Sequence, residues 1–331
     1  MTTLQNPSKK KITLLIPAYN EAGSIRPLYN KLVGLAAGEI VPQNEESSVV
    51  LTDYDWEFLF VNDGSKDNTL EILRDLRKSD PRVNIVNLSR NFGKESAMLA
   101  GMDYCSGDAV VIMDADLQDP VSLIPELVFW WQQGYEDVYG KRRSRGKESW
   151  MRKRLSLAFY SLLQGTTNIE ILPNVGDFRL LDRRVVNAII SLRETQRYTK
   201  GLFCWVGYNK KEVMFDREDR LYDQSDYSLW SLFNLAIDGI TSFTTSPLRI
   251  SAILGFVVSI VAFIYILYIV VKAIVWGDPA AGFPTLISFV ALFGGLQLFS
   301  IGIIGEYIGR IFNETKRRPP YIVESYNEQK K

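Results

Sequence analysis

Two long uncharged stretches near the C-terminal end limit what this chain can fold into. Residues 250–271 and 283–305 contain no charged side chain over 22 and 23 positions. As α-helices with a rise of about 1.5 Å per residue they would be about 33–35 Å long, against a bilayer hydrocarbon core of about 30 Å. A soluble helix of this length rarely lacks a polar face. The sequence therefore predicts two transmembrane helices within residues 248–312, and not a pair of buried core helices.

The charges beside these stretches predict their orientation. The segment at 276–282, which joins them, contains one acid and no base, whereas the tail at 313–331 contains the basic cluster 316–318. Cytoplasmic segments next to membrane spans are enriched in lysine and arginine. We therefore expect the basic tail and the N-terminal part of the chain in the cytosol, with the joining segment outside.

The segment at 229–247 leads into the first span. Leu229, Leu232, Phe233 and Ala236 recur in it at helical intervals. Such an apolar stripe is typical of a helix that lies in the membrane interface. It is equally typical of a helix that packs on a globular domain, so both interpretations stay open.

Composition limits the chemistry of the remaining chain. The 331 residues include no histidine, which excludes Ser-His and Cys-His nucleophiles and zinc sites that need imidazole. Lysine plus arginine and aspartate plus glutamate both number 38, so we expect no nucleic-acid partner. Cys105 and Cys204 are too few for a disulfide framework. Any catalysis must use carboxylates, cations or the substrate itself.

Residues 1–228 alternate short apolar runs with helical patterns. The predicted strands are 12–16, 56–61, 84–88 and 109–113. The predicted helices are 21–36, 69–79, 94–104 and 120–133. This order is typical of an α/β domain with a mostly parallel sheet that binds ligands at the carboxyl ends of its strands. The polar stretch at 38–55 is expected to be a surface insertion.

The turns after these strands are acidic. The first, at 17–21, contains neither the G-x-G-x-x-G nor the P-loop pattern, which disfavours dinucleotide-binding and P-loop domains. Acidic turns follow at 61–69 and 113–120. Asp114 and Asp116 can reach one point if the chain turns there, and their oxygens suit a divalent ion that bridges a diphosphate. A lone Asp-x-Asp can also be a turn or a helix cap, but several acidic turns at one sheet edge favour a ligand site.

Four motifs in a fixed order carry a resemblance. They are 16–21 (Ile-Pro-Ala-Tyr-Asn-Glu), 61–65 (Val-Asn-Asp-Gly-Ser), 89–94 (Ser-Arg-Asn-Phe-Gly-Lys) and 114–120 (Asp-Ala-Asp-Leu-Gln-Asp-Pro). Together they resemble the family-2 glycosyltransferases with a GT-A fold, and most the polyprenyl-phosphate glycosyltransferases, which include dolichol-phosphate mannose synthase. The two C-terminal helices resemble the bacterial branch, which includes bactoprenol (undecaprenyl phosphate) glucosyltransferases. The resemblance implies a cytosolic GT-A nucleotide-sugar-binding domain over 1–228, followed by a transmembrane hairpin in a bacterial inner membrane.

The resemblance also implies roles for single residues. Those expected to bind the nucleotide sugar are Pro17, Tyr19, Asn20, Glu21, Asp63, Lys94, Asp114 and Ala115. Apart from the resemblance, Arg179 in the motif 176–180 (Gly-Asp-Phe-Arg-Leu) is a further candidate, as a cation that neutralises the donor diphosphate. Asp114 and Asp116 would be catalytic, and Asp116 with Gln118 would hold Mg²⁺ or Mn²⁺. Asn62 stands where many relatives carry a second aspartate, a difference that we expect to alter hydrogen bonding but not chemistry.

Two basic groups have more than one interpretation. The loop at 141–147 could neutralise the donor diphosphate, or it could be a solvated run or a contact with anionic lipid. Arg217 and Arg220, three residues apart, could share a helix face and bind the acceptor phosphate. They could equally form a local salt-bridge cluster with the neighbouring acids.

The absence of histidine fits a phosphate acceptor. A phosphomonoester has a second pKa of about 6 and is largely dianionic at neutral pH, so it needs no general base. We therefore expect an inverting transfer of a sugar, by resemblance glucose from UDP-glucose, onto polyprenyl phosphate at the cytosolic membrane face.

Two alternative functions and the oligomeric state stay open. One alternative is a processive polysaccharide synthase, although two spans make a poor channel and the chain has Gln196-Arg197-Tyr198 in place of a Gln-x-x-Arg-Trp motif. The other is a membrane-anchored nucleotide-sugar sensor without turnover. Association of the two helices into a homo-oligomer is also open.

Overall fold

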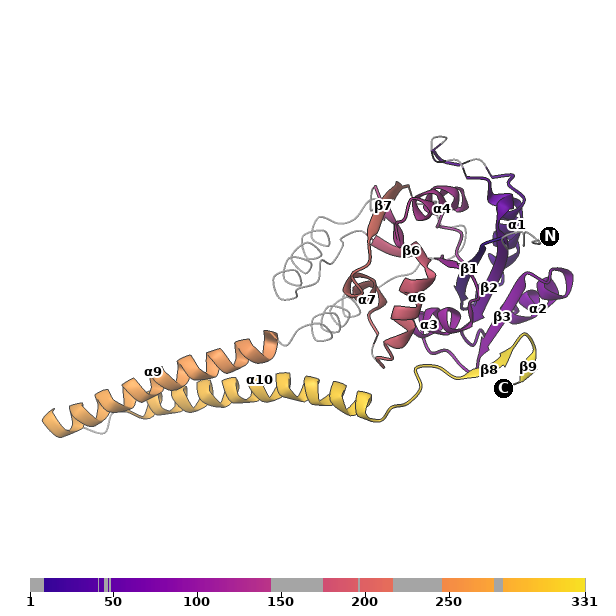
Figure 1. Ribbon diagram of the computed structural model, residues 1–331. Helices are drawn as coiled ribbons and strands as arrows, with labels where there is room; N and C mark the ends of the chain where they lie inside the picture. Colours follow the sequence, from indigo (N-terminus) through magenta and orange to yellow (C-terminus); the bar gives the residue numbers. More distant parts are fainter. Residues whose placement is uncertain are drawn as a thin grey trace, which may run out of the picture.

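The computed structural model describes residues 9–40, 42–44, 47, 49–143, 175–195, 197–216, 246–276 and 282–330. It contains an α/β domain and a long helical hairpin (Figure 1). The strands are β1 (Lys11–Ala18), β2 (Asp55–Asn62), β3 (Val83–Leu88), β4 (Ala109–Ile112), β5 (Asp137–Arg142), β6 (Val175–Asp182), β7 (Lys210–Phe215), β8 (Val323–Tyr326) and β9 (Gln329–Lys330). The α-helices are α1 (Ile25–Ala36), α2 (Thr69–Ser79), α3 (Lys94–Tyr104), α4 (Ile124–Gln132), α6 (Arg183–Ser191), α7 (Thr199–Trp205), α9 (Ser246–Trp276) and α10 (Phe283–Thr315), and the short 3₁₀ helices are η2 (Leu51–Asp53) and η3 (Val121–Leu123).

The nine described strands form one mostly parallel sheet in the order β7-β5-β6-β4-β1-β2-β3-β8-β9. Strands β4, β1, β2 and β3 run parallel, as predicted. Strand β6 is antiparallel to both β4 and β5, and β7 is parallel to β5. The carboxyl ends of β5 and β7 therefore lie at the same sheet edge as those of β1 to β4. This edge is where such a sheet binds ligands.

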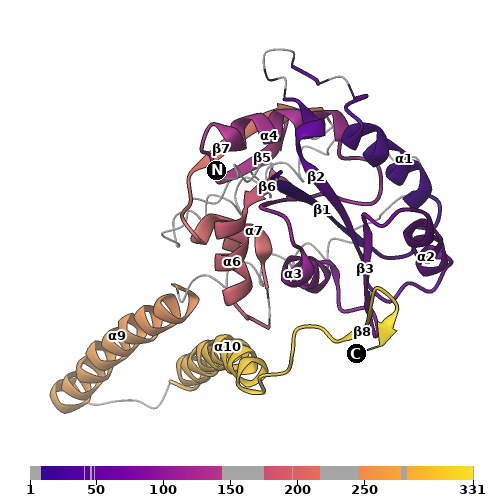
Figure 2. The same ribbon diagram turned by 45° about the vertical axis from the view of Figure 1, so that its right-hand side comes forward.

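Two apolar layers hold the helices on the sheet. Ile12, Leu14 and Ile16 of β1 are buried with residues of α1, α2 and α4 on one face. Leu15, between them in sequence, is buried on the other face with residues of α3, α6 and α7. Side chains of a strand alternate between its faces, so a continuous apolar run is expected where helices cover both faces. Figure 2 shows α1 and α4 on one face and α3 and α6 on the other.

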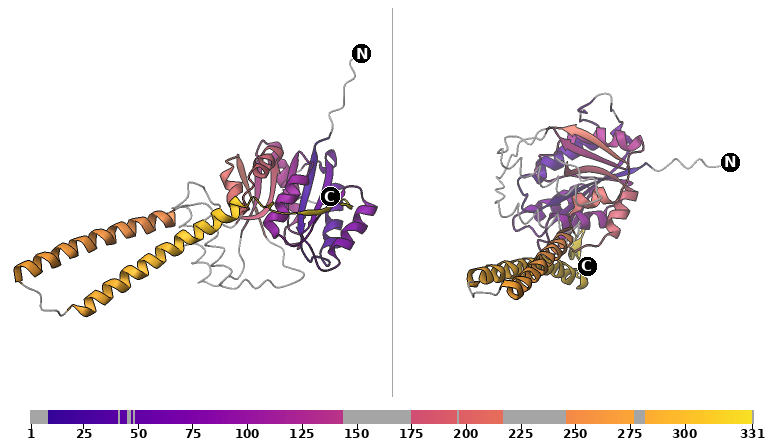
Figure 3. Two further views of the ribbon diagram at one scale, coloured as in Figure 1. Left: turned by 90° about the horizontal axis from the view of Figure 1, so that it is seen from below. Right: turned by 90° about the vertical axis from the view of Figure 1, so that its left-hand side faces the viewer.

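The hairpin of α9 and α10 extends away from the α/β domain, with its two helices side by side (Figure 3). The rings of Tyr265 and Phe289, one from each helix, lie 4.7 Å apart between centroids. Both helices are long and apolar enough to cross a membrane, and only 6% and 0% of the residues in their most apolar windows are buried. This exposure excludes the alternative of two core helices. The helices have 31 and 33 residues and extend beyond the predicted spans.

The tail after α10 returns to the α/β domain, which differs from the predicted plain basic tail. Strand β8 pairs antiparallel with β3 and extends the sheet. The Ser89 amide donates to the Ile322 carbonyl at 3.0 Å, and the Asn327 amide donates to the Ile85 carbonyl at 2.9 Å. Because the chain leaves this domain before α9 and rejoins it after α10, both ends of the hairpin lie on one side of any membrane that it crosses. Of the predicted interfacial segment 229–247, residues 229–245 lie outside the described residues.

Candidate functional site

The turn after β1 is joined to the turn after β2. Its predicted donor-binding residues are Pro17, Tyr19, Asn20 and Glu21. Asn20 has a φ of 56°, a left-handed conformation that asparagine tolerates better than most residues. Its amide donates to the Ser65 hydroxyl at 3.0 Å, and its side-chain oxygen accepts from the Lys66 amide at 2.8 Å. The Glu21 amide donates to the Thr69 hydroxyl at 2.8 Å. These bonds set the two turns at a fixed separation, with Tyr19 41% exposed beside them.

Asp63 holds the second turn against the loop before α3. It is 3% exposed, and its two carboxylate oxygens accept from the amides of Phe92 at 2.7 Å and Gly93 at 2.9 Å. Burial raises the pKa of Asp63, and these amides partly oppose the rise. Gly64 follows with a φ of 64°, and a Cβ there would come within 2.4 Å of the backbone of Arg90. The close approach requires glycine. A contact between Asp63 and the nucleotide base remains a prediction.

Lys94 joins two carboxylates at the carboxyl edge of the sheet. Its Nζ lies 2.5 Å from Asp114 Oδ1 and 2.7 Å from Asp177 Oδ2. Lys94 begins α3, Asp114 follows β4, and Asp177 is on β6. Burial disfavours the charged amine, but the two carboxylates outweigh it and raise the pKa of Lys94 above its ordinary value. Burial likewise disfavours ionised Asp177, yet Lys94 lowers the pKa of that carboxyl below its ordinary value. Lys94 and Asp177 are therefore both ionised at neutral pH.

The Asp-x-Asp turn presents two half-buried carboxylates, those of Asp114 and Asp116. The Asp114 amide donates to Asp119 Oδ2 at 3.0 Å, and the Gln118 amide donates to Asp116 Oδ1 at 3.1 Å. Ala115 is buried between them. Burial, reinforced by the charge of Asp114, raises the pKa of Asp119 to about 7. These bonds close the turn that carries both residues, and the convergence of the Asp114 and Asp116 carboxylates on one point remains a prediction.

The donor set of this turn fits a hard divalent ion that is shared with a substrate. Among the residues that the structure describes, no three His, Cys, Asp or Glu side chains are grouped to hold a metal ion. Mg²⁺ is commonly bound by one or two carboxylates together with substrate phosphates and water. The carboxylate of Asp116 and the side-chain amide oxygen of Gln118, two residues later in the turn, are oxygen ligands of this kind.

Arg179 is buried in β6 opposite Ile112 of β4, and its role in donor binding remains a prediction. Its guanidinium is 3.0 Å from Asp137 Oδ2, and the two side chains are 2% and 1% exposed. The guanidinium carbon also lies 3.8 Å from the ring centroid of Phe203. In this structure the guanidinium is engaged by Asp137 and has little exposed surface. The motif around Arg179 does supply a residue that reaches the site, but that residue is Asp177.

Two described residues of the basic loop, Lys141 and Arg143, form ion pairs. Lys141 Nζ lies 2.8 Å from Glu212, and Arg143 lies 3.4 Å from Asp216. Residues 144–147 of this loop lie outside the described residues, as do both predicted acceptor residues, Arg217 and Arg220.

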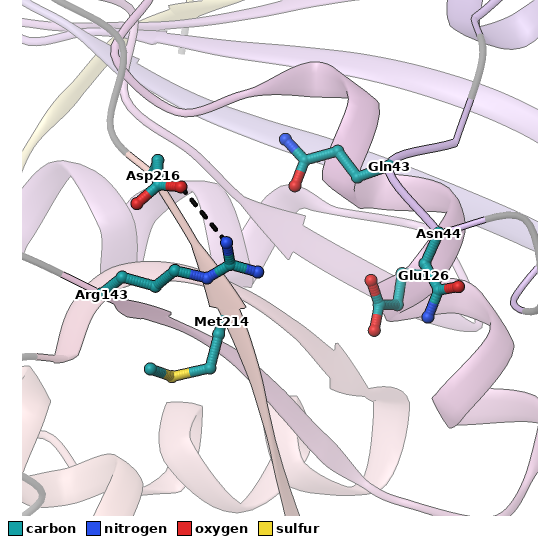
Figure 4. Close-up of a pocket in the computed structure, with 6 residues that line it drawn as sticks. All are labelled: Gln43, Asn44, Glu126, Arg143, Met214 and Asp216. Carbon is teal, nitrogen blue, oxygen red and sulfur yellow. Dashed lines mark hydrogen bonds and ion pairs between the residues drawn. The ribbon is translucent and has the colours of Figure 1, made fainter.

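A hollow of about 510 Å³ lies beside α4 and the ends of β5 and β7 (Figure 4). Its described lining consists of Gln43, Asn44, Glu126, Arg143, Met214 and Asp216. Of these six, only Arg143 belongs to a group with a predicted donor role, the basic loop at 141–147. The strand-end turns are a better candidate for the site than this hollow, because they unite the ionised cluster with the predicted residues.

Glu95 is a second residue that the sequence interpretation missed. Its carboxylate accepts from the Thr199 amide at 3.1 Å and so ties α3 to the start of α7. Burial raises the pKa of Glu95, and the charge of Asp177 adds to the rise. The signals for both missed residues are weak: Glu95 is an acid next to a motif lysine, and Asp177 is an acid two positions before Arg179.

Replacing Asp177 with asparagine tests the ionised cluster. We expect D177N to lower the free energy of unfolding at pH 7 by about 2 kcal/mol, less than the about 3–5 kcal/mol of a wholly buried pair, because Lys94 keeps Asp114 and its side chain is 41% exposed. The pKa of Asp177 is lower in the folded state than its ordinary value of 3.8. The ionised carboxylate therefore stabilises the fold at pH values above 3.8, and this stabilisation is lost as the pH falls below 3.8. Denaturant titrations at pH 7 and pH 3 should show the difference from wild type shrinking in acid. A difference that is constant across this range would contradict the ionised pair.

Comparison with known proteins identifies the family. Residues 13–190 match glycosyl transferase family 2, and residues 246–311 match the GtrB C-terminal hairpin. An uncharacterized glycosyltransferase of Synechocystis sp. is 44% identical over 313 residues, which cover 95% of this chain and 94% of the relative. A prophage bactoprenol glucosyl transferase homolog of Escherichia coli is 41% identical over 314 residues, covering 95% and 98%. The bactoprenol glucosyl transferase of Shigella phage SfX is 41% identical over 315 residues, covering 95% and 99%. The chain therefore belongs to glycosyl transferase family 2 and carries a membrane-associated C-terminal hairpin.

Proposed function

We propose that this protein transfers glucose from UDP-glucose to polyprenyl phosphate, with undecaprenyl phosphate as the acceptor. The observation that carries the proposal is that bactoprenol glucosyl transferases align with nearly the whole chain, hairpin included. A lipid acceptor also explains why a soluble-type catalytic fold is joined to two helices that could cross a membrane. The hairpin holds the strand-end turns near the surface where a lipid phosphate is presented.

The donor is held by the turns after β1, β2 and β4. Tyr19 offers an exposed ring to the base beside the rigid Asn20 turn. Lys94 brings a positive charge to the edge where the diphosphate would lie, although in this structure two carboxylates compensate that charge. Donor phosphates would compete with Asp114 for this amine. Asp114 would then turn toward the ribose or the sugar.

Asp116 and Gln118 are the residues that would hold Mg²⁺ or Mn²⁺. When bound, such an ion stabilises the negative charge that develops on the leaving diphosphate. The Gln118 backbone amide holds the Asp116 carboxylate in place, so this side chain needs little reorganisation when it binds the ion.

The acceptor phosphate attacks the anomeric carbon on the side opposite the leaving UDP, and the product is a β-linked sugar from an α-linked donor. The phosphate oxygen forms the new bond while the bond from carbon to the UDP oxygen breaks. A dianionic phosphate needs no protein base, which agrees with a chain that lacks histidine. Cations must instead attract and orient it.

Arg217 and Arg220 are our candidates for those cations. We expect the double variant R217A/R220A to raise the KM for polyprenyl phosphate by about tenfold or more, since a charge-assisted contact is worth about 1.5–3 kcal/mol. The affinity for UDP should not change. The matched control is R317A/R318A, which removes two exposed arginines of the tail. Equal effects of the two double variants on the acceptor KM would argue for general attraction to the membrane.

We place the catalytic domain in the cytosol of a bacterium and the hairpin in its inner membrane. The basic cluster 316–318 lies between α10 and β8, on the side of the hairpin that carries the catalytic domain. The positive-inside rule then puts both on the cytosolic side. Labelling of a cysteine introduced at Gly282, between the helices, should occur from outside in intact cells.

An activity assay tests the function directly. Purified protein with radiolabelled UDP-glucose, short polyprenyl phosphate and Mg²⁺ or Mn²⁺ should give a labelled monosaccharide that extracts into organic solvent. A polar polymer would indicate a processive synthase. UDP-glucose binding without any product would indicate a sensor. A panel of other nucleotide sugars tests the choice of glucose.

A further inference from the structure

The C-terminal strand is connected to the donor-binding turns by a line of side-chain hydrogen bonds. Glu324 of β8 accepts from the Asn87 side-chain amide at 2.8 Å. Asn87 in turn accepts from the Asn62 side-chain amide at 2.7 Å. Asn62 then accepts from the Ser65 amide at 3.4 Å, and Ser65 accepts from the Asn20 amide at 3.0 Å. The line begins beyond both membrane helices and ends in the turn after β1.

The fold places these residues in register. Asn62 and Asn87 are direct cross-strand partners at the ends of β2 and β3, and they are 1% and 4% exposed. On β8, Ser325 pairs with Asn87 and Val323 pairs with Leu88, so Glu324 is the extra residue of a bulge. Bulges redirect side chains. Here the bulge coincides with the point at which Glu324 reaches Asn87.

Two further contacts fasten the same tail. The Tyr321 hydroxyl donates to Asp103, which also accepts two hydrogen bonds from Arg193 at 2.6 and 2.7 Å. The Thr195 amide donates to Glu314, in the last turn of α10, at 3.0 Å. The tail is therefore held to α3 and the α6–α7 connection as well as to β3. Displacement of the hairpin would be transmitted to the tail and so to Glu324.

We infer that Glu324 is a positioning residue for nucleotide-sugar binding, and that through it the tail beyond the membrane hairpin orders the turns after β1 and β2. The inference rests on the proposed function, which assigns the donor to these turns. Buried polar side chains that are hydrogen-bonded in series fix one another's orientation. A buried polar group left without a hydrogen-bond partner at either end of the series costs free energy. Asn87 without its acceptor would be able to rotate. Asn62 would then no longer be held in the orientation that accepts from Ser65.

The test is the variant E324A, compared with E324Q, which keeps an acceptor oxygen for Asn87. We expect E324A to raise the KM for UDP-glucose and the Kd for UDP by about threefold to tenfold, as for one lost hydrogen bond, while kcat and the acceptor KM stay near wild type. E324Q should behave as wild type. Hydrogen exchange of a peptide that covers residues 62–66 should be faster in E324A without any ligand present.

A polarity swap distinguishes the hydrogen-bond line from general stability. N87D removes the donor to Glu324 and keeps the acceptor for Asn62, so it should reproduce the E324A effect. Adding E324Q to N87D supplies a donor from the other side and should restore the UDP affinity. The matched control N327G removes the Asn327 side-chain hydrogen bonds to Ile85 and Asn84, away from the turns, and keeps the left-handed backbone. It should lower thermal stability without changing the UDP affinity.

The outcomes separate this inference from the proposed function. If wild type transfers glucose and E324A leaves the donor KM unchanged, the inference is wrong and the function stands. If wild type gives no glucose product, the function is wrong, and the exchange of residues 62–66 together with the UDP affinity still decides the inference. Equal loss of UDP affinity in E324A and N327G would show that Glu324 affects donor binding only through general stability, and the inference would be wrong.

Discussion

The variant D116N should lose about 10³-fold or more of the rate of glucose transfer, the largest effect on activity that we expect in this chain. Removing one electrostatic contact to a developing charge typically costs about 10²–10³ in rate. Loss of a metal ligand should be at least as costly. Asparagine keeps the oxygen that accepts from the Gln118 amide, so the turn should keep its conformation. The loss would then report charge and not misfolding.

The response to metal makes this prediction specific. In wild type, Mn²⁺ should tighten UDP binding, and in D116N this difference should disappear while the metal-free affinity stays the same. The matched control is D75N, an aspartate on α2 whose side chain is 59% exposed and which pairs only with surface cations in the described structure. D75N should keep full activity. Wild-type metal dependence in D116N would rule out Asp116 as the ligand.

The first half of the α/β domain could be predicted from sequence because its signals are local. Apolar runs bounded by turn residues indicate the four strands β1 to β4, and helical periodicity indicates α1 to α4, with ends displaced by up to four residues. Position at the carboxyl ends of parallel strands then places Asn20, Asp63 and Asp114 at one edge. Contacts between these turns are short because the strands are neighbours in the sheet.

What could not be predicted depends on partners that are distant in sequence. β8 has four residues and pairs with β3, from which it is separated in sequence by α9 and α10. A strand this short can be identified only when its pairing partner is known, and the sequence of residues 323–326 does not indicate that the partner is β3. Asn62 is similar: the family resemblance implies that it stands in place of an aspartate, but its hydrogen bond to Asn87 follows only from the register of β2 and β3. An aspartate could not donate that bond when ionised.

Arg179 shows the same limit inside the predicted site. It sits in an eight-residue strand between β4 and β5, and the motif gives no indication of which way its side chain points. Its partner Asp137 begins β5, 42 residues earlier. An arginine in a motif is more often exposed than buried, because burying its charge requires a paired acid. That acid could be identified only from the fold.

The variant R179M should lower the free energy of unfolding at pH 7 by about 3–5 kcal/mol relative to wild type, as when one partner of a buried ion pair is removed. This loss is larger than the one expected for D177N. Asp137 would stay buried with no cation beside it. Burial already raises the pKa of Asp137, and loss of Arg179 would raise it further. A carboxyl with a raised folded-state pKa binds more protons folded than unfolded, so the destabilisation of R179M should become smaller as the pH falls from 7 toward 4.

The double variant R179M/D137L separates the ion pair from donor binding. Replacing a buried pair with apolar side chains of similar volume is often neutral or stabilising by about 1–4 kcal/mol, so D137L should recover most of the stability that R179M loses. Denaturant titration in detergent measures the recovery. If Arg179 contacted the donor, the stable double variant would still bind UDP weakly. We expect its UDP affinity to equal that of wild type, because a guanidinium that is 2% exposed and stacked on Phe203 has little surface with which to contact a donor.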